Sequence, residues 1–163
     1  MKMEPRISII TLGVEDLDRA AAFYAALGLE RHEGITDGVA FFQMGGLILA
    51  LWPREELARD AGLRRAPVRP SAVVAADPGK PVVMEAASVG APGVALAYNT
   101  RSEAEVGEIL ALADKAGGRV VKQAGRAVWG GVQGYFYDTE GKLWEVAHNP
   151  DFPIDAEGRI SLP

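Results

Sequence analysis

The sequence predicts an α+β fold of two βαβββ modules. Two observations predict it. Each half of the chain has one β-branched segment, then an amphipathic helical segment, then three short apolar segments. Glycine-containing turns separate the short segments in both halves. A chain of 163 residues suits one such duplicated domain.

The first module is expected over residues 1–53. Residues 7–12 are mostly β-branched and predict a strand, and Asp16 is a suitable N-cap for the helix that follows. Apolar side chains at i, i+3, i+4 and i+7 give this helix one core-facing side: Ala20, Phe23, Tyr24 and Leu27. Three short strands are expected after it, at 29–33, 39–44 and 47–52.

Residues 54–92 are expected to connect the two modules. Residues 54–62 predict a short helix, and the remainder is rich in Ala, Pro, Val and Gly, as is typical of a linker. This segment therefore separates the two repeats.

The second module is expected over residues 93–148. It begins with a strand at 94–98, and Ser102 with Glu105 forms a capping box for the next helix. The core-facing side of this helix repeats the spacing of the first: Val106, Ile109, Leu110 and Ala113. Its three strands are expected at 119–123, 132–137 and 142–147. The tail, residues 149–163, carries four large apolar residues, so we expect it to be docked on the body.

Composition excludes several classes of function. With no cysteine, the chain has no disulfide, thiolate ligand or cysteine nucleophile, and its two histidines cannot form a histidine-rich metal site. A net charge of -5 argues against a nucleic-acid partner. No apolar run approaches the roughly 20 residues of a membrane span. We therefore expect a cytoplasmic protein without nucleic-acid or membrane partners.

Glu145 is the most unusual residue, because it lies inside an apolar strand and burying an unpaired charge is costly. It is the candidate catalytic residue, as a substrate anchor or a base. The alternative is a structural carboxylate held by buried hydrogen bonds. Trp129, in a glycine-flanked loop, could cover a ligand or could plug the space between the modules.

Two segments carry a family resemblance. Residues 14–24 read V-x-D-L-x-x-A-x-x-F-Y and residues 138–145 read D-x-x-G-x-L-W-E. With the duplicated order of elements, they resemble the vicinal oxygen chelate superfamily, which includes glyoxalase I, bleomycin resistance proteins and extradiol dioxygenases. The resemblance implies that the two modules form a curved mixed sheet around a ligand-binding cleft, with the helices on the outside. The usual assembly of the superfamily suggests a homodimer.

Metal-dependent members of that superfamily place four ligands on the first and last strands of the two modules. Carried over to this sequence, the positions are Ile9, Leu49, Ala95 and Glu145. Three of these side chains are hydrocarbon and cannot ligate a divalent cation. We therefore expect no cofactor, and a divalent metal only if this alignment is wrong. The expected ligand-binding residues are Ile9, Thr11, Leu49, Ala95, Asn99, Trp129, Tyr135 and Glu145.

Three functional hypotheses remain open. The first is a metal-independent binder of a small organic molecule in an apolar cleft, with bleomycin-resistance-like sequestration as its nearest named activity. The second is a lyase, isomerase or dioxygenase, either metal-dependent or using Glu145 as a base. The third is an assembly protein without a ligand.

Overall fold

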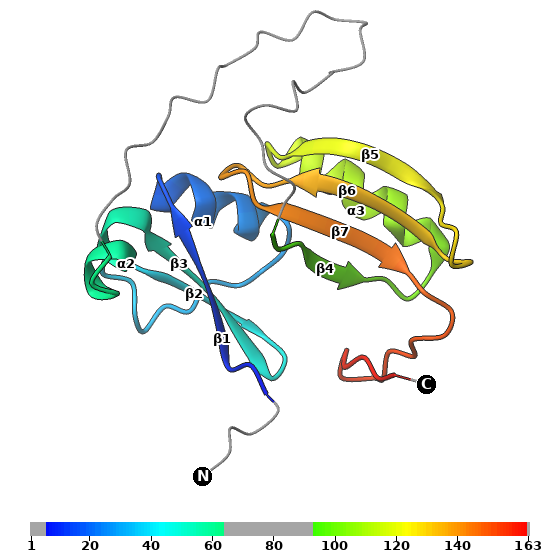
Figure 1. Cartoon of the computed structure of the whole chain (residues 1–163), viewed down its shortest axis with the longest axis horizontal. Helices are drawn as coiled ribbons and strands as arrows, with labels where there is room; N and C mark the ends of the chain where they lie inside the picture. Colours follow the sequence, from blue (N-terminus) through cyan, green and yellow to red (C-terminus); the bar gives the residue numbers. More distant parts are fainter. Residues whose placement is uncertain (1–5, 64–92, 163) are drawn as a thin grey trace, which may run out of the picture.

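The computed structural model describes residues 6–63 and 93–162, and it has the predicted α+β fold (Figure 1). The first half contains β1 (Ile9–Val14), α1 (Leu17–Ala26), β2 (Ala40–Met44), β3 (Leu47–Pro53) and α2 (Arg54–Asp60). The second half contains β4 (Leu96–Asn99), α3 (Glu103–Lys115), β5 (Arg119–Arg126), β6 (Val132–Tyr137) and β7 (Leu143–His148).

These strands form two mixed sheets. The first sheet has the order β1-β3-β2, with β1 parallel and β2 antiparallel to β3. The second has the order β4-β7-β6-β5, with β4 parallel to β7 and the other pairs antiparallel. In both sheets the first strand of the module therefore lies at an edge, beside the last strand of the same module.

The strand expected at residues 29–33 is the main local error of the sequence prediction. Only Arg31 makes a β-bridge there, to Phe42. The Arg31 guanidinium instead donates hydrogen bonds to the carbonyls of Thr36 (3.1 Å) and Val39 (2.9 Å). These bonds hold the chain in a loop, so the first sheet has three strands where four were expected. Most of the predicted linker lies outside the described residues.

Helix α1 begins and ends as its sequence predicts. The Asp16 side chain accepts a hydrogen bond from the Arg19 amide at 3.0 Å, which satisfies one of the free N–H groups of the first turn. After the C-cap, Gly28 has φ of +91°, a conformation that glycine adopts at little cost.

Aromatic side chains of α1 join the two modules. Phe23 and Tyr24 are buried, and the Phe23 ring lies 6.2 Å from Phe136 of β6. Tyr24 lies 5.8 Å from Phe42 of the first sheet and 6.0 Å from Trp144 of the second. In Figure 1, α1 accordingly lies between the first sheet and the end of the second, while α3 packs along the second sheet. Both sheets thus share α1 as part of their core.

A buried polar network fixes the same contact. The Tyr24 hydroxyl donates to Oδ2 of Asp138 (2.6 Å) and accepts from Nε1 of Trp144 (3.2 Å). The other Asp138 oxygen accepts from the amides of Glu140 (2.9 Å) and Lys142 (2.7 Å), which shapes the β6–β7 turn. Burial, followed by the charge of Asp138, raises the pKa of the Tyr24 phenol, so the hydroxyl remains a donor.

The β6–β7 turn also binds the start of α1 through Glu140. Its side chain is only 1% exposed. It accepts hydrogen bonds from the Glu15 amide (2.6 Å) and from Nε of Arg19 (3.2 Å). The two segments that carried the family resemblance are therefore in direct contact.

The C-terminal tail is attached mainly by hydrogen bonds. Arg101 donates to the carbonyls of Ile154 (3.2 Å) and Asp155 (2.8 Å), and Ile154 forms a β-bridge with Ile160. Of the apolar anchors expected in this tail, Phe152 and Ile154 are partly buried, whereas Ile160 and Leu162 are exposed.

We predict that Tyr24→Phe lowers the free energy of unfolding by about 1.5–3 kcal/mol, because it removes a hydrogen bond to a buried carboxylate. Urea denaturation measures this loss. Tyr98→Phe is the matched control. The Tyr98 hydroxyl is exposed and forms no hydrogen bond within the described chain, so its loss should change stability by no more than about 0.5 kcal/mol. Equal effects in the two variants would contradict the assigned role of Tyr24.

Candidate functional site

Glu145 lies in a polar row that crosses the second sheet on the face opposite the core, here called the outer face. Strand register aligns Ala97 of β4 with Glu145 of β7, Glu145 with Tyr135 of β6, and Tyr135 with Lys122 of β5. Residues aligned in this way point to the same face of a sheet. The neighbouring row contains Asn99, Ala147 and Gln133.

A bulge in β5 brings Lys122 into this row. Val120 pairs with Phe136 on the core face, and simple alternation would place Lys122 on that face too. The register shifts between Val120 and Lys122, so Lys122 pairs with Tyr135 instead. Bulges commonly re-aim a side chain in this way.

Hydrogen bonds link the side chains of the two rows. The Tyr135 hydroxyl donates to Oε1 of Glu145 at 3.0 Å. With its amide oriented to satisfy both neighbours, Gln133 donates to the same oxygen at 2.7 Å and accepts from Nζ of Lys122 at 2.9 Å. The other oxygen of Glu145, Oε2, accepts no hydrogen bond from the described residues, so it is available to a ligand.

The surroundings of Glu145 are more polar than the apolar cleft of the first functional hypothesis. Its hydrogen-bond partners, Tyr135 and Gln133, both come from β6. Gln133, and Lys122 that bonds to it, were absent from the predicted site. Burial, followed by the hydrogen bond and charge of Glu145, raises the pKa of the Tyr135 phenol. Tyr135 is therefore a hydroxyl donor beside the carboxylate and is not suited to act as a base.

Two cations flank the aromatic side chains of β6. Nζ of Lys122 lies 5.4 Å from the Tyr135 ring centroid, and Cζ of Arg119 lies 5.1 Å from that of Tyr137. Within the described chain neither cation forms an ion pair. The outer face thus offers a carboxylate oxygen on β7 and, two strands away on β5, positive charge that has no ion-pair partner among the described residues.

The predicted residues of the first module lie on a different surface. Ile9 and Thr11 are on the outer face of the first sheet, where Ile9 is 49% exposed and pairs with Ile48. Leu49, expected beside Ile9, is 3% exposed on the opposite face and belongs to the core. Its expected position was one residue out of register, so Ile48 takes that place. Ala95 precedes β4, and Ala97 aligns with Glu145 instead.

The outer face of the first sheet has an apolar cavity of about 280 Å³. Its wall includes Ile9, Ile35, Phe41 and Ile48, with His32 as its one titratable side chain. No residue of the second module lines it. Phe41 is partly buried on this face, whereas its neighbour Phe42 is fully buried in the core.

Trp129 lies at the β5–β6 connection, where Ala127 and Gly131 close the loop with a hydrogen bond of 2.9 Å. Its ring packs against Gly131 so closely that a Cβ at this position would come within 1.8 Å of a ring atom. The ring remains 42% exposed. Trp129 therefore packs on its own loop beside β6, and its proposed role as a cover for a ligand stays a prediction.

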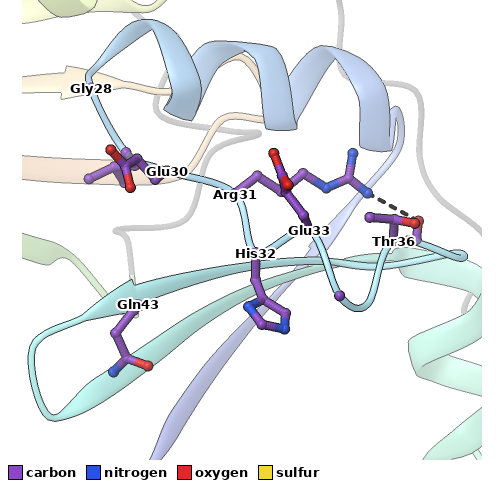
Figure 2. Close-up of a pocket in the computed structure, with 9 residues that line it drawn as sticks. Gly28, Glu30, Arg31, His32, Glu33, Thr36 and Gln43 are labelled. Carbon is purple, nitrogen blue, oxygen red and sulfur yellow. Dashed lines mark hydrogen bonds between the residues drawn. The ribbon is translucent and has the colours of Figure 1, made fainter.

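A wide groove of about 1030 Å³ beside the C-terminus of α1 contains several charged side chains but no convergent site. In Figure 2, Glu33 and His32 point to opposite sides of the backbone. Arg31 is engaged with the carbonyl of Thr36, as the dashed line in Figure 2 shows. These side chains do not face a common point at which a ligand could be held.

The positions that hold a metal in metal-dependent relatives do not fit one here. With the observed register they are Ile9, Ile48, Ala97 and Glu145, of which only Glu145 has a ligating atom. Across residues 6–63 and 93–162, no three His, Asp or Glu side chains are grouped to hold a metal ion. None of the helices described there is long and apolar enough to cross a membrane.

Comparisons with known proteins identify proteins that share this duplicated α+β fold. The model of the Glyoxalase/Bleomycin resistance protein/Dioxygenase superfamily matches residues 6–146. A glyoxalase-related enzyme from Fulvimarina pelagi is 30% identical, with a TM-score of 0.77 over 98% of this chain and 99% of that one. The chain belongs to the Glyoxalase/Bleomycin resistance protein/Dioxygenase superfamily.

Two more distant structures share the fold. A glyoxalase/bleomycin resistance protein/dioxygenase from Nocardioides is 21% identical, with a TM-score of 0.66 over 91% of this chain and 85% of that one. A lactoylglutathione lyase from Agrobacterium tumefaciens is 24% identical, with a TM-score of 0.58 over 91% and 96%. Comparison with curated protein sequences finds no match.

We predict that Tyr135 ionises at a higher pH than a free tyrosine, and that Glu145→Gln moves its pKa part of the way back. Burial, the largest cause of the shift, remains in that variant, whereas the negative charge is removed. NMR titration of the tyrosine ring carbons, assigned with Tyr135→Phe, measures both values. If Tyr135 titrates identically with and without Glu145, the hydrogen bond between them does not form in solution.

Proposed function

We propose that the protein is a metal-independent binder of a small organic molecule, held on the outer face of the second sheet. The free Oε2 of Glu145, fixed by Tyr135 and Gln133, is the observation that carries the proposal. A carboxylate whose orientation is already set loses little entropy on binding a donor. The site is more polar than the apolar cleft that the sequence predicted.

The arrangement indicates what this molecule should look like. One end should present an N–H or O–H group to Oε2 of Glu145. A flat, electron-rich or anionic part would lie toward Tyr135 and Lys122, where the positive charge is not neutralised within the described chain. Asn99, on the same face, can supply a further polar contact.

We further propose that the chain acts as a homodimer, with the cytoplasm as its compartment. Among the described residues β1 and β4 each have one unpaired edge, and Ile9 on the outer face of the first sheet is 49% exposed. Unpaired edges favour pairing with another chain. The apolar cavity on the first sheet would then cover the polar rows of the partner's second sheet and exclude water from the ligand. Dimers are also the common assembly in the superfamily.

An enzymatic role is the second candidate. Glu145 could remove a proton from a bound substrate, and the Tyr135 hydroxyl beside it could donate a hydrogen bond to the negative charge that develops. A lyase or isomerase reaction would need no more than these two groups. The similarity to a glyoxalase-related enzyme favours testing this possibility.

We predict that protein treated with EDTA binds compounds from a panel of small aromatic acids, alcohols and amines, measured by thermal shift and then by calorimetry. Glu145→Gln should weaken binding at least tenfold, because the ligand loses a charge-assisted hydrogen bond. The control is Glu108→Gln, at an exposed glutamate on α3. Binding that requires added Zn²⁺ or Mn²⁺, or that is equal in both variants, would overturn the proposal. Turnover of a bound compound that Glu145→Gln abolishes would establish the enzymatic alternative.

We predict that light scattering across a dilution series reports a dimer, and that Ile9→Glu shifts it toward monomer. A charge on the exposed face of β1 would have to be desolvated in the proposed interface. Glu108→Lys, on the helical side of the second module, should leave the dimer intact. A monomer at all concentrations would exclude the dimer while leaving the binding proposal standing.

A further inference from the structure

A second cavity, of about 240 Å³, lies where the two modules meet. Leu27, Leu29 and Met44 of the first module form one side of it. Ile109 of α3 and the rings of Phe136 and Trp144 of the second sheet form the other. The cavity therefore exists only while the two modules are held together as described above.

Its chemistry differs from that of the outer face. None of the described residues that line it carries a charge. Tyr24 also contributes to the wall, but its hydroxyl is occupied by Asp138 and by Nε1 of Trp144. The Tyr98 hydroxyl is the one side-chain polar group of the wall that has no hydrogen-bond partner within the described chain, and this residue is 45% exposed.

The walls are fixed before any ligand arrives. The rings of Phe136 and Trp144 are stacked with an interplanar angle of 1°. The two hydrogen bonds of Tyr24 hold its ring in place. A dry apolar cavity of about 150 Å³ is already sufficient to bind benzene in another protein. A preformed space of this kind costs a ligand little reorganisation.

We propose that this cavity is a second binding site, for a small neutral aromatic molecule with at most one hydroxyl group. The aromatic ring would pack among Phe136, Trp144 and Ile109, and a hydroxyl would meet that of Tyr98. A charged molecule would lose its hydration without gaining a partner, so the site rejects ions. The proposal is independent of the function proposed above, because Trp144 and Glu145 point to opposite faces of β7.

The test uses toluene and phenol as probes and benzoate as a charged analogue of similar size. Because the neutral probes bind only the folded protein, near-saturating concentrations should raise the unfolding midpoint by about 2–4 °C. They should also move the Nε1–H NMR signal of Trp144 and leave those of Trp52 and Trp129 in place. Benzoate should move neither the midpoint nor the Trp144 signal.

Two filled variants make the test specific. Ile109→Trp and Leu112→Phe each extend a wall side chain into the cavity, so the variant that folds should lose the response to toluene. Glu145→Gln, on the opposite face, should keep it. An unchanged Trp144 signal in the native protein, or an equal response in a folded filled variant, would overturn the proposal. Failure of Glu145→Gln to affect the outer-face ligand would bear only on the proposed function.

Discussion

The hydrogen bond between the buried Tyr24 hydroxyl and Asp138 is the constraint on which the rest of the structure depends. Asp138 shapes the β6–β7 turn by accepting hydrogen bonds from two backbone amides. The same carboxylate accepts the hydrogen bond of the Tyr24 hydroxyl of α1. An unpartnered carboxylate in this position would be costly, so α1 and the turn form as a pair. Glu140 adds a second attachment at the start of the helix. The two segments that carry the family resemblance, residues 14–24 and 138–145, therefore bind each other. We call this contact between α1 and the β6–β7 turn the joint between the modules.

This joint determines which surfaces remain for function. Since α1 packs on the core faces of both sheets, it does not cover the opposite faces, where Ile9 and Thr11 are exposed and Tyr135 and Glu145 are partly exposed. One of them is apolar, around Ile9 and Ile48, and the other carries the linked side chains of Glu145, Tyr135, Gln133 and Lys122. Neither is a complete binding site, because among the described residues the first cavity has only His32 and Gln43 as polar side chains and the second face has no cover. The complementary character of the two faces is the physical reason for regarding a second copy of the chain as part of the site.

The sequence predicted the fold well because its signals are local. Asp16, Gly28 and the apolar spacing around Phe23 place the first helix correctly. Alternation in β7 places Glu145 on the opposite face from Trp144. The errors arise where long-range contacts decide. Arg31 donates to two loop carbonyls, so its segment does not form the predicted strand. Leu49 was predicted opposite Ile9, but the pairing of β1 with β3 places Ile48 there, and the local sequence does not show this register. Lys122 reaches the site through a bulge, and only the pairing of β5 with β6 shows where this bulge falls.

The same strand, β7, serves both proposed sites, and this limits how they can influence each other. Trp144 faces the cavity between the modules and Glu145 faces the outer surface, one residue further along. A ligand on one face could affect the other only by shifting the strand. Trp144 is held by the stacked ring of Phe136 and by its bond to Tyr24, while β7 is paired on both edges, with β4 and β6. Such a strand resists displacement, so we infer that the two sites bind independently while Tyr24 keeps its bond to Asp138. Binding at one site could change affinity at the other only if the contact between α1 and the β6–β7 turn were broken.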